Sequence, residues 1–149
     1  MKISILIALA LILAACSAGG SDLSRNQQKW EDGNISDYRF QLTIGCFCPY
    51  RDIMPLTVEV RGGEIVSITG VDGVTIPATN PDYEFFSRFA TIDKIFSELE
   101  AATGNAEAGD VVVTYDPTLG YPVEASIDYI ELAIDDELSV SVSGFEPLP

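Results

Sequence analysis

Two cysteines, Cys46 and Cys48, flank Phe47 and are the first residues in this chain whose spacing suggests chemistry. Thiols this close can form a disulfide, stay reduced in the core, or take part in redox or metal chemistry. In an oxidising compartment a structural disulfide is the expected state. On one strand the two Cα atoms would lie about 6.5–7 Å apart, at the limit for a disulfide, unless a bend at Pro49 brings them closer. We expect the small ring to be strained and readily reduced, which keeps a thiol-redox or metal-responsive role as the alternative.

Acidic side chains form the second candidate group, and the chain contains no histidine. The lack of histidine excludes Ser-His and Cys-His nucleophile pairs and His-ligated metal sites. The carboxylates do not follow the spacing of a calcium-binding EF-hand, and paired carboxylates for glycan hydrolysis are the weakest alternative. We therefore expect no catalytic residue, no metal site and no cofactor, and a solvated acidic rim formed by Asp116, Asp128, Asp135, Asp136 and Glu137.

The N-terminus has the pattern of an export signal. Lys2 precedes an apolar run from Ile3 to Leu13, which is too short to span a membrane. The following sequence, Leu-Ala-Ala-Cys, ends at Cys16 and resembles the lipobox of bacterial lipoproteins. The resemblance implies that residues 1–15 are removed and that Cys16 carries the lipid, whose several acyl chains give stable membrane anchoring.

The lipobox also implies a location in the cell envelope. Ser17 follows the cysteine, where an aspartate retains enteric lipoproteins at the inner membrane. We therefore expect the periplasmic face of the outer membrane if the source has one. Residues 16–23 are expected to be the lipidated cysteine and a flexible tether, and residues 24–149 a single domain.

The charge balance excludes one class of partner. The chain contains eight Lys and Arg residues and 23 Asp and Glu residues, which gives a formal net charge of −15. Nucleic-acid binding needs clusters of basic side chains, so we expect no nucleic-acid partner. An anionic membrane surface should repel the domain as well.

Hydrophobic periodicity predicts an α+β domain. Apolar alternation indicates about six strands, and helical spacing indicates two helices, with Trp30 expected to anchor the first helix to the sheet. The order helix then three strands occurs twice, which predicts an antiparallel sheet with both helices on one face. The expected helices are 24–32 and 91–103, and the expected strands lie in 35–48, 55–70, 111–129 and 138–142, with an irregular segment at 71–90 whose aromatic residues close one end of the core.

The other face of the predicted sheet is expected to be open to solvent and lined by Thr, Ser, Glu and Arg. Its charged positions are the candidate binding face, together with the 71–90 loop as a second contact. These positions are Arg39, Glu59, Arg61 and Glu124.

Short motifs spread over residues 30–142 resemble a known family as a set. They are Asp37-Tyr38, Cys46-Phe47-Cys48-Pro49, Val58-Glu59-Val60 with Gly63, Thr91-Ile92-Asp93 with Ile95-Phe96, Tyr115-Asp116-Pro117, Gly120-Tyr121-Pro122, Asp128 and Asp135-Asp136-Glu137-Leu138. The chain thereby resembles the bacterial lipoproteins of the domain of unknown function 6174 family. The resemblance implies one extracytoplasmic domain with a lipid anchor, and no catalytic or cofactor-binding residues to carry over.

The sequence therefore predicts a membrane-anchored, non-enzymatic module of the cell envelope that binds a protein partner or another envelope component. The alternative hypothesis is a thiol-redox or metal-responsive lipoprotein that acts through Cys46 and Cys48.

Overall fold

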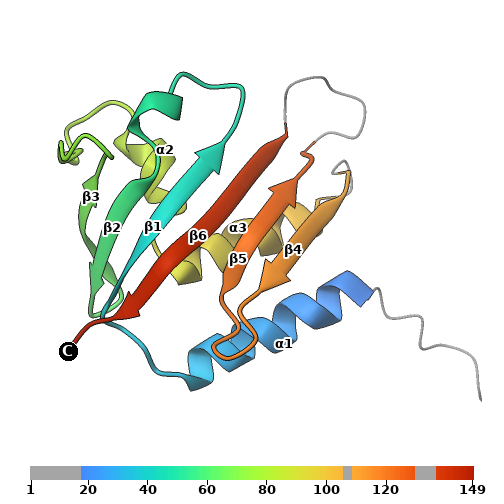
Figure 1. Cartoon of the computed structure of the whole chain (residues 1–149). Coiled ribbons are helices and arrows are strands. Elements are labelled where there is room, and N and C mark those ends of the chain that lie inside the picture. Colours follow the sequence, from blue (N-terminus) through green and yellow to red (C-terminus); the bar gives the residue numbers. More distant parts are fainter. Residues whose placement is uncertain (1–17, 106–108, 130–136) are drawn as a thin grey trace, which may run out of the picture.

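A computed structural model describes residues 18–105, 109–129 and 137–149. Its six strands form one open antiparallel sheet in the order β3-β2-β1-β6-β5-β4, which confirms the predicted α+β fold (Figure 1). The strands are β1 Tyr38–Gly45, β2 Leu56–Arg61, β3 Glu64–Thr69, β4 Val111–Tyr115, β5 Pro122–Ile127 and β6 Leu138–Pro147. The helices are α1 Ala18–Asp32, α2 Tyr83–Ser87 and α3 Ile92–Thr103, with a 3₁₀ turn, η1, at Arg51–Ile53.

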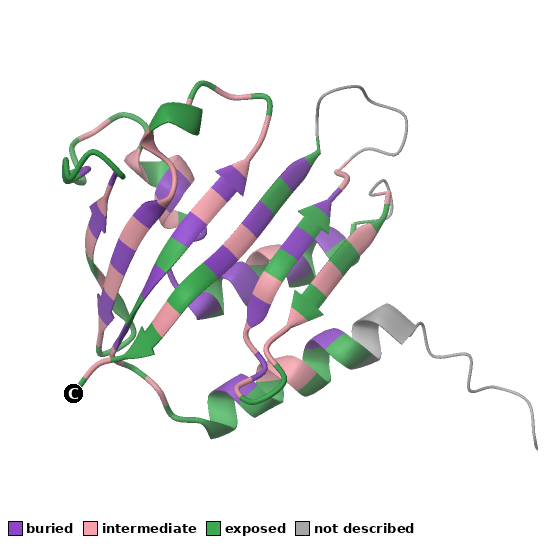
Figure 2. Ribbon diagram, viewed as in Figure 1, coloured by how far each residue is buried: buried purple, intermediate pink, exposed green. Residues whose placement is uncertain are grey.

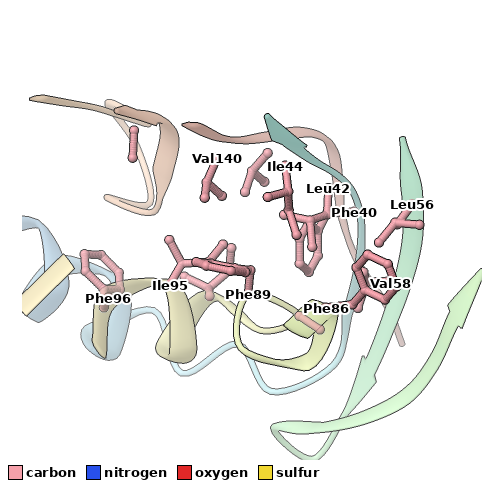
Figure 3. Packing of buried hydrophobic residues seen from close by; sticks show 14 of the residues in the cluster. Phe40, Leu42, Ile44, Leu56, Val58, Phe86, Phe89, Ile95, Phe96 and Val140 are labelled. Carbon is pink, nitrogen blue, oxygen red and sulfur yellow. The ribbon is translucent and has the colours of Figure 1, made fainter. Parts of the chain in front are cut away.

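The core lies between one face of the sheet and the helices. Along β1 every second side chain is buried, and the alternation continues across neighbouring strands (Figure 2). Figure 3 shows how sheet residues such as Leu42 and Val140 face Phe89 and Ile95 from the helical layer. The apolar residues that alternate along each strand in the sequence therefore lie on the buried face of the sheet.

The two halves of the chain enter the sheet differently. β1 occupies the middle, and β2 and β3 follow outward to one edge. β4 starts at the opposite edge, and β5 and β6 follow inward until β6 pairs with β1, with Leu42 opposite Val142. The order of helix and three strands thus repeats along the chain, but equivalent strands of the two halves do not hold equivalent places in the sheet.

Helix α1 begins earlier than the sequence suggested. Residues from Ala18 to Leu23 are helical, although this stretch was expected to belong to a flexible tether. Leu23 and Trp30 are seven residues apart, lie on one side of the helix and are both buried, so packing extends the helix toward the N-terminus. Cys16 lies outside the described residues. Within the described parts of the chain, no helix is long and apolar enough to cross a membrane.

The segment expected to be irregular, 71–90, contains the short helix α2 as a third helix. Phe86 and Phe89 are fully buried, and the Tyr50 ring contacts Phe85 and Phe86 at centroid distances of 5.2 and 4.8 Å. The prediction that these aromatic residues close one end of the core is confirmed.

Helix α3 follows its sequence signals closely. The Thr91 hydroxyl caps it by accepting a hydrogen bond from the Lys94 amide at 3.1 Å. The predicted apolar stripe is buried in full and consists of Ile92, Ile95, Phe96, Leu99 and Ala102.

One aromatic junction joins α1, α3 and the middle of the sheet. The Trp30 ring meets Tyr38 edge-on at 5.4 Å, and its indole nitrogen donates to the Asp93 carboxylate at 3.1 Å. The Ile92 amide, at the start of α3, donates to the buried Tyr38 hydroxyl at 3.0 Å. Burial raises the pKa of Tyr38 to about 12, so this hydroxyl remains protonated at neutral pH.

Tyr38→Phe tests the junction. The substitution keeps the ring and leaves the buried Ile92 amide without its acceptor, so we expect the free energy of unfolding to fall by about 1–3 kcal/mol. Urea titration at pH 7 measures the loss. Tyr50→Phe is the matched control, because its hydroxyl bonds Asp82 at the exposed surface.

The pKa of Tyr38 is higher in the folded than in the unfolded chain, so the free energy of unfolding of the wild-type protein should also fall as pH rises from about 10 toward 12, and it should fall less in Tyr38→Phe. Equal losses of unfolding free energy at pH 7 in Tyr38→Phe and Tyr50→Phe would contradict the role of the Tyr38 hydroxyl in the junction.

Candidate functional site: the uncovered sheet face and the disulfide turn

One face of the sheet is not covered by any helix of the described residues (Figure 1). Helices α1 and α3 contribute to the core on the opposite face, and α2 does so through Phe86. The uncovered face carries mainly hydroxyl, amide and charged groups: Arg39, Gln41, Thr43, Thr57, Glu59, Arg61, Ser67, Thr69, Val112, Thr114, Glu124, Ser126, Ser139, Ser141 and Ser143.

Three of the four predicted binding residues lie together at one corner of this face. Arg39 is opposite Glu59 on the neighbouring strand, and Arg61 bonds Glu59 at 3.1 Å. Arg39 also pairs with Glu146 of β6 at 2.7 Å. These side chains are partly exposed, so each pair contributes no more than about 1 kcal/mol to stability. Their main effect is to hold two guanidinium groups in fixed positions.

Arg61 connects this corner to the start of β1 and to the C-terminal residues. Its Nη1 lies 3.9 Å from the Asp37 carboxylate and donates to the backbone oxygen of Pro149 at 2.8 Å. The Leu148 amide in turn donates to the backbone oxygen of Asp37 at 2.8 Å. The C-terminal residues are thereby tied to the start of β1, and the corner keeps its shape through contacts of its own.

Glu124, the fourth predicted residue, lies apart from the other three. It is opposite Ser141 of β6, and Ser141 is opposite Thr43 of β1. This register places Glu124 two strands and four residues from Arg39, roughly 15 Å away. It shares the face with the arginine corner but is not part of it.

A shallow hollow of about 470 Å³ lies on the uncovered face over β1, β2 and β3. The turn from Gly70 to Gly73 borders it and presents Val71, which is 60% exposed. Polar side chains contribute to its floor: Gln41, Thr57, Glu59, Ser67 and Thr69. Such a surface suits a polar ligand or the polar side chains of a protein partner.

Cys46 and Cys48 form a disulfide just beyond the end of β1. Cys46 packs against the edge of the core, but β1 ends at Gly45 and the chain bends there, so the two cysteines do not continue the strand. The bend brings the two Cα atoms to 5.2 Å, closer than a straight strand allows. Both cysteines are half-buried.

The disulfide turn presents Phe47 to solvent. This side chain is 85% exposed, and a hollow of about 590 Å³ beside it is lined by Thr43, Cys46, Pro49, Arg51 and Met54. Sequence reasoning did not select Phe47 as a binding residue. The available signal was the Cys-Phe-Cys spacing itself, because a disulfide between the flanking cysteines leaves Phe47 at the tip of a tight turn.

Among the residues of the predicted acidic rim, Asp116 has a clear role in local structure. The Asp116 carboxylate accepts hydrogen bonds from the amides of Thr118 and Leu119 and so closes the β4–β5 turn. Asp135 and Asp136 lie outside the described residues. Among the described residues, no group of three or more Cys, Asp or Glu side chains is arranged to hold a metal ion.

Comparison with known proteins gives a single result. No curated protein matches the chain. A protein family described as a family of unknown function, DUF6174, matches residues 22–147, which include the whole sheet, α2, α3 and most of α1. The chain therefore belongs to the DUF6174 family of unknown function.

Proposed function

We propose that this protein is a membrane-anchored, non-enzymatic binding module of the cell envelope, and that it recognises a protein or another envelope component through the uncovered sheet face. The observation that carries the proposal is the contrast between the two faces of one sheet. One face is closed by three helices and a continuous apolar core, while the other offers hydroxyl groups and fixed charges to solvent.

The arrangement of charges supports recognition rather than catalysis. Arg39 and Arg61 are each held by carboxylates of the same corner. A partner that offers both hydrogen-bond acceptors and donors can bind the arginines and the carboxylates of these ion pairs at the same time. Charge complementarity of this kind contributes mainly to specificity and association rate.

The proposed anchor lies close to the folded domain. Only Ser17 separates Cys16 from the first residue of α1, a reach of roughly 7 Å. The N-terminal end of α1 would then lie near the bilayer.

Cys16→Ser tests the anchor. Without the thiol there is no acceptor for the lipid, so we expect the protein to lose incorporation of labelled palmitate and to leave the membrane fraction. The double variant Cys46→Ser/Cys48→Ser is the control and should keep both the label and the membrane fraction. Label that persists in Cys16→Ser would disprove lipidation at this residue.

Arg39→Glu tests the uncovered face. The proposal predicts one dominant partner after in-cell crosslinking of the tagged protein, with recovery reduced about tenfold by this substitution, equivalent to about 1.4 kcal/mol. Two controls separate recognition from folding. Lys94→Glu makes the same charge change on α3, behind the sheet, and should retain the partner.

The swap Arg39→Glu/Glu146→Arg supplies the second control, because it keeps an ion pair but reverses its polarity. It should remain folded and still lose the partner. Unchanged recovery in both Arg39→Glu and the swap would exclude this corner as the recognition surface.

The second candidate function is thiol–disulfide exchange at the Cys46–Cys48 disulfide. Both cysteines are partly exposed beside the 590 Å³ hollow, which leaves room for an attacking thiolate. A partner dithiol would donate two electrons and two protons, reduce the disulfide to two thiols and itself become a disulfide.

Differential alkylation with mass spectrometry tests this candidate. If the disulfide exchanges, mild thiol treatment of the folded protein should make both Cys46 and Cys48 alkylatable, and incubation with a disulfide substrate should reverse this. The unfolded protein, treated identically, gives the fully reducible reference. A disulfide that resists reduction until the protein unfolds would assign it a structural role.

A further inference from the structure

The two edges of the sheet differ in how they are protected. At the β3 edge the chain folds back on itself: Gly70 donates to Val74 at 2.9 Å, Ile76 donates to Ile68 at 2.8 Å, and an isolated bridge joins Thr69 to Thr75. A register shift in the β2–β3 pairing adds an irregularity at the same edge. Coverage and bulges of this kind prevent further strands from pairing.

The β4 edge has no such cover among the described residues, although its pairing with β5 also has one register shift, between Thr114 and Tyr115. Its sequence, Val-Val-Val-Thr-Tyr, contains no charge, glycine or proline and favours an extended strand. β4 is the last strand in the sheet order, and within the described residues no strand pairs with its outer side (Figure 1). The Val112 side chain of this strand, on the uncovered face, is 63% exposed. An edge with these properties is a ready template for strand addition.

The backbone groups available on this edge can be assigned from the hairpin. The Asp110 carbonyl accepts from Asp128 at 3.1 Å, and the Asp116 amide donates to Tyr121 at 2.8 Å, so both residues turn their backbone groups toward β5. Backbone direction alternates along a strand, so Val111 and Val113 turn their amides and carbonyls outward.

A groove runs beside this edge between β4 and the helices α1 and α3. Its volume is about 560 Å³, and its apolar lining consists of Leu23, Leu99, Ala102, Val111, Val113 and Tyr115. A strand added to β4 would point every second side chain into this groove, which is the arrangement used in β-strand addition.

The charges at the groove identify the kind of occupant. Asp110 is exposed at the start of β4, and Asp22, which pairs with Arg25 at 2.9 Å, borders the groove on α1. A second copy of the chain is disfavoured, because antiparallel pairing centred on Val113 would place Asp110 opposite Asp116 at both ends, between two molecules of charge −15. A segment rich in Lys or Arg would instead bring positive side chains beside these carboxylates, where they are attracted.

We propose that β4 is a docking edge at which a cationic, extended segment of a partner protein adds a seventh strand, with alternate apolar side chains in the groove between α1 and α3. This surface is separate from the arginine corner, so the inference does not depend on the function proposed above.

The test uses a fluorescein-labelled octapeptide that alternates lysine and valine, and the lipid-free Cys16→Ser protein. We expect saturable binding by anisotropy, and in hydrogen exchange we expect the amides of Val111 and Val113 to gain protection. Methylation of the peptide amides on one edge should abolish binding, while methylation on the other edge should leave it intact, because only one edge of an added strand bonds to β4. A glutamate–valine peptide should not bind.

Three protein variants complete the design. Asp110→Lys should weaken binding about fivefold to tenfold through charge repulsion. Glu64→Lys changes the net charge equally at the β3 edge and should have no effect. Arg39→Glu should leave peptide binding unchanged even if it abolishes partner capture. No saturable binding up to about 1 mM peptide, equal weakening by both lysine variants, or protection of Val111 and Val113 by self-association without peptide would overturn the proposal.

Discussion

The hydrogen bond from the Ile92 amide to the Tyr38 hydroxyl is the contact on which the layered arrangement depends. The first amides of a helix have no partner within the helix, and this one lies in a dry core where water cannot replace a missing acceptor. Tyr38 supplies the acceptor from the middle strand of the sheet. Trp30 packs on the same ring and bonds Asp93 in the first turn of α3, so α1 is fixed by the same contact. Both long helices are thereby held to one face, and the opposite face stays uncovered.

The order of the strands decides which surfaces remain available. β1 and β6 meet in the middle, so the chain ends beside its own first strand, and Arg61 fixes the C-terminal backbone there. The edges are then left to β3 and β4, and only β3 is covered by the segment that follows it. After β4 the chain turns inward to β5, which leaves no described segment for its outer side. The difference between the edges is thus a consequence of topology rather than of local composition.

The sequence predicted what depends on local periodicity. The buried stripe of α3, the alternation along β1, the anchoring role of Trp30 and the uncovered polar face all follow from spacing alone. It failed where tertiary contacts override local signals. Gly19 and Gly20 suggested a tether, but burial of Leu23 extends α1, and the chain leaves the strand at Gly45, before Cys46 and Cys48. Strand order was not accessible either, so the distance of Glu124 from Arg39 and the bare edge at β4 could not be seen beforehand.

The edge and the uncovered face are physically linked through the rows of the sheet. Thr114, Glu124, Ser141 and Thr43 follow one another across four strands, each directly opposite the next. A strand added at β4 contributes the next residue of this row, because successive side chains of the new strand point to opposite faces. Its apolar side chains would enter the groove beside α1, while its basic side chains would lie on the uncovered face beside Thr114 and within one further strand of Glu124. The acidic residue that stands apart from the arginine corner is therefore placed to select the charge of a segment that binds at the edge.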